Sequence, residues 1–136
     1  MGEARLVFVD ANIFLELMFD DKKADECENF LIKIRNKEIE AETTDFIIYT
    51  CLLQIQQKLK SLNYMQKFIL LIGDLNLNII RPSLEDIYDA TKIVEKYNLD
   101  FDDSLIVSCM KSNNIKTLIS LDKHFDKVDF IKRSEP

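Results

Sequence analysis

The sequence is poor in the residue types that most often interrupt regular structure. Its 136 residues include only 2 Gly and 2 Pro, so we expect few special turns and a high content of regular structure, mostly helix. No glycine-rich motif of the kind that cradles phosphate groups is present. Internal repeats, linkers and low-complexity tracts are also absent from the sequence.

Cysteines and long apolar runs are scarce as well. The three cysteines, Cys27, Cys51 and Cys109, are odd in number and lack the spacing of a metal site, which is typical of reduced, buried residues in a cytoplasmic protein. Charged residues interrupt the start of the chain, and the apolar run at residues 6–9 is too short for a signal peptide. No run approaches the length of a membrane span, so we expect no association with a membrane.

Positive charge is in the minority. The chain carries 18 Lys and Arg against 24 Asp and Glu, a formal net charge of −6, which argues against a surface that binds nucleic acid by bulk electrostatics. An enzyme that holds a phosphodiester through a metal ion is not excluded, because the ion reverses the local charge. The length and the 47% hydrophobic content predict a single domain, residues 1–136.

Strand-like and helix-like segments alternate along the chain. Short apolar or β-prone segments predict strands at residues 6–9, 40–43, 78–80, 117–120 and 129–131. Apolar residues at helical spacing predict helices at residues 12–19, 22–35, 46–60, 64–74 and 84–97, and one that ends near residue 113. This order predicts an α/β fold with helices on both faces of a central parallel sheet of four or five strands, in which the first strand lies between the second and the fourth.

The most informative segment is LVFVDANIF, residues 6–14. An apolar strand runs directly into Asp10, and Asn12 follows where the next helix begins. An ionised carboxylate at the edge of a core is costly unless something pairs with it, and ligands of open α/β sheets bind at the carboxyl ends of the strands. Asp10 is therefore a candidate site residue, although Asp10 or Asn12 is equally suited to cap the helix.

Two further acids occupy equivalent positions. Asp103 lies in the first turn of a helix, and Asp122 comes two residues after the strand at 117–120. If that strand lies beside the first one, Asp10 and Asp122 converge, and a divalent cation is needed to neutralise the cluster. Mg²⁺ and Mn²⁺ prefer such all-oxygen sites, and in-line hydrolysis of a phosphodiester is the reaction that suits them best. Each acid taken alone is also explained as a cap or a turn residue.

Three segments together resemble one known family. VDANIF at 9–14, LDFDDSLIVS at 99–108 and TLISLDKHFDKV at 117–128 are similar in order and spacing to the motifs of the PIN-domain ribonucleases, notably the toxin nucleases of prokaryotic toxin–antitoxin pairs. The resemblance covers essentially the whole chain. It implies a PIN-like three-layer α/β/α sandwich, Mg²⁺- or Mn²⁺-dependent endonucleolytic cleavage of RNA, a two-fold homodimer and, for a toxin, an antitoxin protein as partner.

The resemblance also implies roles for individual residues. The acids implied as catalytic residues and metal ligands are Asp10, Asp103 and Asp122. The residues implied to contact the substrate or to support these acids are Asn12, Thr50, Asp102 and Ser120. In this alignment Asp102 is the cap that neighbours Asp103, and Ser120 occupies a small hydroxyl position two residues before Asp122.

One position departs from the family pattern. The family's second acid is a Glu early in the helix after the second strand, and Thr50 occupies that position here. Asp45 does not substitute, because five residues at about 100° each place it roughly 140° around the helix. We interpret it as the helix cap, a role for which Thr44 is the alternative. Thr50 shares a polar stripe with Gln54 and Gln57, which is compatible with a weaker metal site that carries one charge fewer. The alternative function is a degenerate, non-catalytic PIN-like module that binds RNA or protein.

His124 and one apolar helix are further candidate functional features. His124, the only histidine, lies beside Asp122 and is a residue type suited to proton transfer, although an exposed histidine without a role is the alternative. The helix at 64–74 is apolar on most sides, which predicts an interface with a partner. Receiver-like domains and haloacid-dehalogenase-like phosphatases also place acids at strand ends, but they expect an acidic pair or Asp-x-Asp where this chain has Asp-Ala-Asn.

Overall fold

Residues 5–136 are described by a computed structural model of the chain. In chain order their elements are β1 (Arg5–Val9), α1 (Ala11–Met18), α2 (Ala24–Arg35), β2 (Ile39–Thr44), α3 (Asp45–Leu59), α4 (Leu62–Asp74), β3 (Asn78–Ile80), α5 (Leu84–Tyr97), α6 (Phe101–Ser112), β4 (Thr117–Ile119), the 3₁₀-helix η1 (Lys123–Lys127) and β5 (Lys132–Ser134). The expected alternation of strands and helices is confirmed. No helix within these residues is long and apolar enough to cross a membrane.

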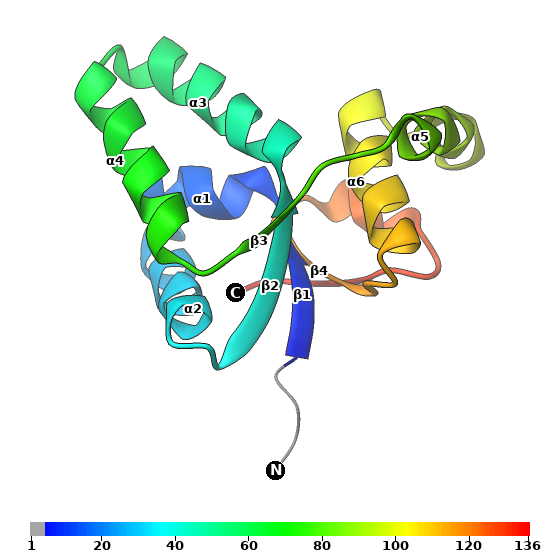
Figure 1. Ribbon diagram of the computed structural model, residues 1–136, viewed down its shortest axis with the longest axis horizontal. Coiled ribbons are helices and arrows are strands. Elements are labelled where there is room, and N and C mark those ends of the chain that lie inside the picture. Colours follow the sequence, from blue (N-terminus) through cyan, green and yellow to red (C-terminus); the bar gives the residue numbers. More distant parts are fainter. Residues whose placement is uncertain (1–4) are drawn as a thin grey trace.

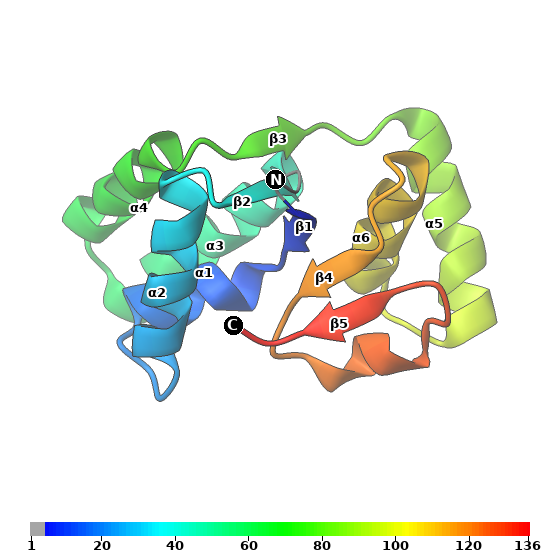
Figure 2. The ribbon, with the colours of Figure 1, turned by 90° about the horizontal axis from the view of Figure 1, so that it is seen from below.

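The strands form one parallel sheet with helices on both faces. The strand order is β3-β2-β1-β4-β5, and every neighbouring pair is parallel. Helices α1 to α4 lie on one side of the sheet, and α5 and α6 lie on the other (Figure 1). The view turned by 90° separates the same three layers (Figure 2). The predicted α/β/α sandwich is confirmed, with the first strand flanked by the second and the fourth.

The core explains the continuous apolar run of the first strand. Val7, Phe8 and Val9 have no exposed surface, because helices cover both faces of the sheet at β1. Such burial on both faces is what removes the alternation of apolar and polar residues from a central parallel strand. The three cysteines are free and buried, as expected.

The predicted helix caps at Asp45 and Asp102 are wrong, whereas Thr44, the alternative to Asp45, is confirmed. Thr44 is the N-cap of α3, since its side chain accepts from the N–H of Ile47 at 3.0 Å, whereas Asp45 is the first helical residue and points a carboxylate oxygen to within 3.8 Å of Arg81 Nε. Asp100 is the N-cap position of α6. Asp102 therefore lies inside the first turn, because the helix begins two residues earlier than a cap at Asp102 requires.

The last strand is displaced from its predicted position at residues 129–131. The segment before it is a tight turn, in which the N–H of Ile131 donates to the carbonyl of Val128 at 3.2 Å. Pairing with β4 begins at Lys132, whose N–H donates to the carbonyl of Lys116 at 2.8 Å. The apolar residues of 128–131 point into the core from this turn, and the edge strand itself is polar. The other four strands agree with the prediction to within one residue at each end.

Candidate functional site

The carboxyl ends of β1 and β4 form the floor of the candidate site. Val9 and Ile119 are paired in register, and the N–H of Asp10 continues the ladder by donating to the carbonyl of Ile119 at 3.0 Å. Asp10 and Ser120 are the next residue of each strand, so the pairing of two buried strands places them side by side. This is the edge at which parallel α/β sheets bind ligands.

Asp10 is a buried carboxylate with nearly all its acceptor positions filled. It is 6% exposed and is the N-cap of α1, with Oδ1 accepting from the N–H of Ala11 at 2.7 Å. Oδ2 accepts from Ser120 Oγ at 2.6 Å and from Asn12 Nδ2 at 3.1 Å. A carboxylate has about four acceptor positions, so one position on Oδ1 is left for another ligand. Asp10 is thus both a helix cap and a candidate site residue.

Asn12 and Ser120 connect the two loops that carry Asp10 and Asp122. Asn12 Oδ1 accepts from the N–H of Leu121 at 3.1 Å, and its Nδ2 lies 3.2 Å from Ser120 Oγ. Ser120 Oγ in turn accepts from the N–H of Asp122 at 3.0 Å. These hydrogen bonds fix the loop after β4 relative to the start of α1.

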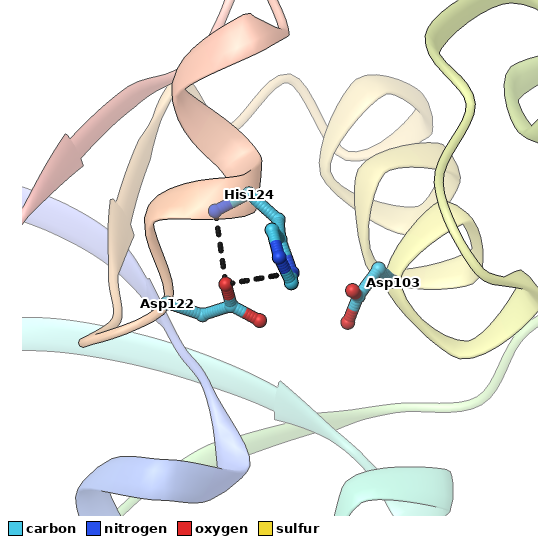
Figure 3. Close-up of side chains that lie close together, drawn as sticks. All are labelled: Asp103, Asp122 and His124. Atoms are coloured by element: carbon cyan, nitrogen blue, oxygen red, sulfur yellow. Dashed lines mark hydrogen bonds and ion pairs between the residues drawn. The ribbon is translucent and has the colours of Figure 1, made fainter.

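Asp103, Asp122 and His124 come together from two different helices (Figure 3). Asp103 lies in the first turn of α6, and Asp122 is the N-cap of η1, where Oδ1 accepts from the N–H of His124 at 2.9 Å. One carboxylate oxygen of each acid and one ring nitrogen of His124 all lie within 4.8 Å of one another. Within residues 5–136 no hydrogen bond or ion pair reaches the carboxylate of Asp103. Among the described residues, the neighbouring Asp102 accepts only from the N–H of Asp103, at 3.0 Å, and it is exposed.

Burial and the charges of neighbouring acids raise the pKa of Asp10 and of Asp103. Burial raises the pKa of Asp10; hydrogen bonds from Ser120 and Ala11 oppose this rise, and the charges of Asp122 and Asp102 add to it. Burial, followed by the charges of Asp102, Asp10, Asp122 and Asp100, raises the pKa of Asp103 to about 7. With its pKa raised to about 7, the Asp103 carboxyl takes up either a proton or a cation near neutral pH. The site is therefore built to attract positive charge.

A cavity of about 280 Å³ gives the Asp103 side chain access to solvent. It is lined by Asn98, Leu99, Asp100, Asp103, His124 and Lys127. Lys127 Nζ donates to the carbonyl of Asn98 at 3.0 Å, which places an ammonium group in the wall of an otherwise acidic cavity.

Thr50 lies on α3 and is half-buried. The next residue, Cys51, has its thiol 3.8 Å from the carbonyl of Ala11, and burial together with the charge of Asp10 raises the pKa of this thiol to about 12. The turn of α3 that contains Thr50 therefore lies beside the first residue of α1. Gln54 and Gln57 do not extend this polar stripe toward the acids, because they line a separate cavity at the opposite end of α1, with Phe19 and Lys58.

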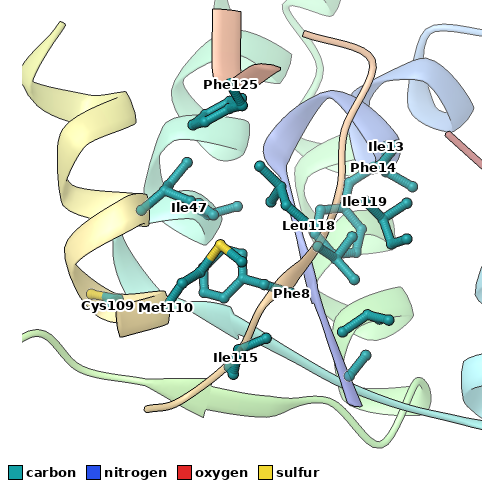
Figure 4. Close-up of a cluster of buried hydrophobic side chains, with 14 of the residues drawn as sticks. Phe8, Ile13, Phe14, Ile47, Cys109, Met110, Ile115, Leu118, Ile119 and Phe125 are labelled. Carbon is teal, nitrogen blue, oxygen red and sulfur yellow. The ribbon is translucent and has the colours of Figure 1, made fainter. Parts of the chain in front are cut away.

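Arg133 is a positioning residue that the sequence did not reveal. Its guanidinium donates to the carbonyl of Ser120 at 3.0 Å and to Asp126 in η1 at 2.7 Å. On the inner side of η1, Phe125 is fully buried in the core (Figure 4). These contacts from β5 and from the core hold the short helix at whose start Asp122 lies. Because they depend on the pairing of β4 with β5, no local sequence pattern indicates them.

Three solved structures are similar to this one over almost its whole length. The VapC20 toxin of Mycobacterium tuberculosis, which cleaves the sarcin–ricin loop, has a TM-score of 0.78 at 12% identity, and the match covers 96% of this chain and 99% of that one. VapBC2 of Rickettsia felis, bound to a DNA fragment from its promoter, gives 0.73 at 16% identity over 96% and 98%. A toxin–antitoxin complex from Klebsiella pneumoniae gives 0.72 at 14% identity over 96% and 99%. At these identities the likeness establishes the fold.

The family is established by the sequence. None of the curated proteins compared with the chain matches it. A family model described as PIN domain matches residues 7–131, which include every acid of the candidate site. Because this match spans nearly the whole chain, the protein belongs to the PIN domain family.

Proposed function

We propose that this protein is a divalent-metal-dependent endoribonuclease and the toxin of a toxin–antitoxin pair. The observation that carries the proposal is the convergence of Asp103 and Asp122, beside the buried Asp10, without a cationic partner for Asp103 within residues 5–136. Membership of the PIN domain family supports RNA as the substrate class. The net charge of −6 is consistent with a site that holds a phosphodiester through a metal ion rather than through a basic surface.

The donor atoms of the site fit Mg²⁺ or Mn²⁺. Both ions prefer oxygen ligands, and two ligands of one Mg²⁺ at about 2.1 Å lie at most about 4.2 Å apart. The ligand atoms of Asp103 and Asp122 lie within 4.8 Å of each other, which is close to this span. Asp10 has one acceptor position left on Oδ1. These three acids would hold the ion.

The side chains of the site prepare it for this chemistry. When bound, the ion supplies positive charge that neutralises the carboxylates and a phosphate and lowers the pKa of water. Ser120 and Asn12 hold the Asp10 carboxylate in one orientation, so the carboxylate does not have to reorient when an ion binds. Asp103, whose pKa is about 7, releases its proton readily when positive charge arrives. Lys127, in the wall of the cavity, supplies a further positive charge for an incoming phosphate.

Two surface features are suited to binding other protein chains. An apolar groove of about 210 Å³ runs between α1, α2 and α4, lined by Leu17, Glu28, Leu31, Ile32, Arg35, Leu71, Asp74 and Leu75. We propose that it receives a segment of an antitoxin, since two of the similar structures are complexes of toxins with antitoxins. Exposed apolar side chains on α3 and α4 support a homodimer.

The free, buried cysteines support a cytoplasmic location.

A second candidate function is a non-catalytic PIN-like module that binds RNA or protein. The observation in its favour is Thr50, which puts a hydroxyl group where the family pattern has a carboxylate. The site then carries one charge fewer, and ligand charge tunes the affinity of such sites over orders of magnitude. We therefore expect weak Mg²⁺ binding, tighter Mn²⁺ binding, and low or absent cleavage.

The test is cleavage of a labelled single-stranded RNA by protein without an affinity tag. We expect cleavage with Mn²⁺, slower cleavage with Mg²⁺, none with EDTA, and a loss of at least about 100-fold in Asp10→Asn. Lys111→Ala, an exposed change at the far end of α6, is the control and should cleave like the parent. Equal rates in Asp10→Asn and the parent would show that a contaminant cleaves the RNA. RNA binding without cleavage at saturating Mn²⁺ would favour the non-catalytic module.

A further inference from the structure

His124 presents its ring to the two acids of the candidate site. Its Nδ1 lies 3.1 Å from Asp122 Oδ1, and its side chain is 74% exposed. Figure 3 shows the imidazole between Asp122 and Asp103, on the side of the acids away from β1. The ring also lines the cavity that opens onto Asp103. His124 therefore belongs to the group formed with Asp103 and Asp122, and it also lines the cavity through which Asp103 meets solvent.

The backbone that carries this ring is fixed. His124 donates its N–H to Asp122 Oδ1 at 2.9 Å in the first turn of η1. The next residue, Phe125, is fully buried, and Asp126 is bound by Arg133 at 2.7 Å. The short helix is therefore attached to the core and to β5, so the ring stays close to the acids although its outer edge meets solvent.

The short separation between the His124 ring and Asp122 suits two ligands of one ion. Nδ1 lies 3.1 Å from Asp122 Oδ1, and two ligands at right angles on one ion, each about 2.1 Å from it, lie about 3 Å apart. Neutral imidazole binds a metal through either ring nitrogen, so Nδ1 is placed to share an ion with a carboxylate oxygen of Asp122. The second oxygen of Asp122 has no hydrogen-bond partner within residues 5–136 and is free for the same ion.

We propose that His124 is a nitrogen ligand of the divalent ion and supplies the donor that is missing at Thr50. The inference rests on the proposed function, because it takes the ion from there and adds one ligand to it. A ring nitrogen and one oxygen from each of Asp103 and Asp122 already lie within 4.8 Å of one another. Both ions prefer oxygen ligands, but Mn²⁺, as a transition-metal ion, accepts an imidazole nitrogen more readily than Mg²⁺, which dehydrates reluctantly and keeps several waters. His124 thereby makes the site selective for ions such as Mn²⁺ over Mg²⁺.

Electron paramagnetic resonance of bound Mn²⁺ tests this ligand directly. Because His124 is the only histidine in the sequence, imidazole nitrogen coupling to Mn²⁺ in tag-free protein arises from this residue alone. We expect the coupling in the parent and in Lys123→Ala, a matched control on an exposed position of the same 3₁₀-helix. It should be absent in His124→Ala, whose fold should be unaffected because the side chain is exposed.

Calorimetric titration of the same proteins measures the selectivity. We expect His124→Ala to weaken Mn²⁺ binding by at least about tenfold and Mg²⁺ binding by less than about threefold. Saturable Mn²⁺ binding without nitrogen coupling would overturn the assignment of His124 and leave the carboxylate site intact. The absence of saturable Mn²⁺ binding in the parent would overturn this assignment together with the proposed metal dependence.

Discussion

Ser120 joins three parts of the site through one hydroxyl group. Its Oγ donates to Asp10, lies next to the Asn12 amide and accepts from the backbone of Asp122. We predict that Ser120→Ala lowers the free energy of unfolding by about 1–3 kcal/mol, because it removes a hydrogen bond to a buried carboxylate. Urea denaturation measures this loss.

Ser104 provides the matched control for Ser120→Ala. Both serines are fully buried, but Ser104 Oγ has no hydrogen-bond partner among residues 5–136. Ser104→Ala should leave the free energy of unfolding unchanged or raise it slightly, because removing an unsatisfied hydroxyl from the interior costs nothing. Equal losses in the two variants would mean that the hydroxyl of Ser120 contributes only through packing.

The raised pKa of Asp103 makes stability depend on pH. In the folded protein this pKa is about 7, against an ordinary value of 3.8, so the folded state binds the proton more tightly than the unfolded chain. The resulting stabilisation is complete below about pH 4 and is lost as the pH rises through 7. We predict that, in EDTA, the Tm of the protein falls between pH 5 and pH 8.

Asp103→Asn tests the origin of this fall. The amide cannot ionise, so the variant should have a higher Tm than the parent at pH 8 and a smaller difference between pH 8 and pH 5. Asp10, whose pKa is also raised, accounts for the dependence that remains. Added Mn²⁺ should stabilise the parent more at pH 8 than at pH 5, because the ion replaces the proton. A Tm at pH 8 no higher in Asp103→Asn than in the parent would contradict this account.

At the scale of elements, α3 carries the departure from the family pattern. The turn that contains Thr50 passes the start of α1, as the contact between Cys51 and Ala11 shows. We predict that Thr50→Glu tightens Mn²⁺ binding by about tenfold or more, because it adds a carboxylate to an acidic site, and that it speeds RNA cleavage. Calorimetric titration measures the affinity.

Gln54→Glu is the control for charge alone. It adds the same carboxylate one helical turn later, where the side chain lines the cavity beside Phe19, so Mn²⁺ affinity should remain close to that of the parent. If Thr50→Glu binds Mn²⁺ no better than the parent, Thr50 does not face the acids and the alignment of α3 with the family pattern is wrong.

The elements that could be predicted from sequence are those with an apolar pattern. β1 is a continuous apolar run because helices cover both of its faces, whereas β5 (Lys132–Ser134) is a polar edge strand without such a pattern. The start of α6 was misplaced because Asp100 and Asp102 are equally suited to cap a helix. Asp10 and Asp122 could be identified because they follow strands. Arg133 could not, because its partners meet it only through the pairing of β4 with β5.

At the scale of the whole molecule, one face of α4 has no partner within residues 5–136. The helix buries Phe68 and Ile72 against the core but leaves Ile69 53% and Leu70 72% exposed. We predict that sedimentation at micromolar concentration gives a species of about twice 15.9 kDa. The double variant Ile69→Glu/Leu70→Glu should shift this species toward the monomer, because it buries charge in an apolar interface.

Leu84→Glu distinguishes α4 from another exposed apolar surface, at the start of α5, where Leu84 is 86% exposed. It should leave the dimer intact if α4 forms the interface. A monomeric parent would contradict the homodimer, and a dimer that only Leu84→Glu dissociates would move the interface to α5.

Anomalous diffraction from crystals soaked in Mn²⁺ measures directly where the ion binds. With Asp10, Asp103 and Asp122 as ligands, we predict one strong peak, about 2.0–2.3 Å from a carboxylate oxygen of each acid, at the carboxyl ends of β1 and β4. A peak bound by other residues would contradict the assignment of these acids as the metal site. So would the absence of a peak at saturating Mn²⁺ with all three carboxylates ordered.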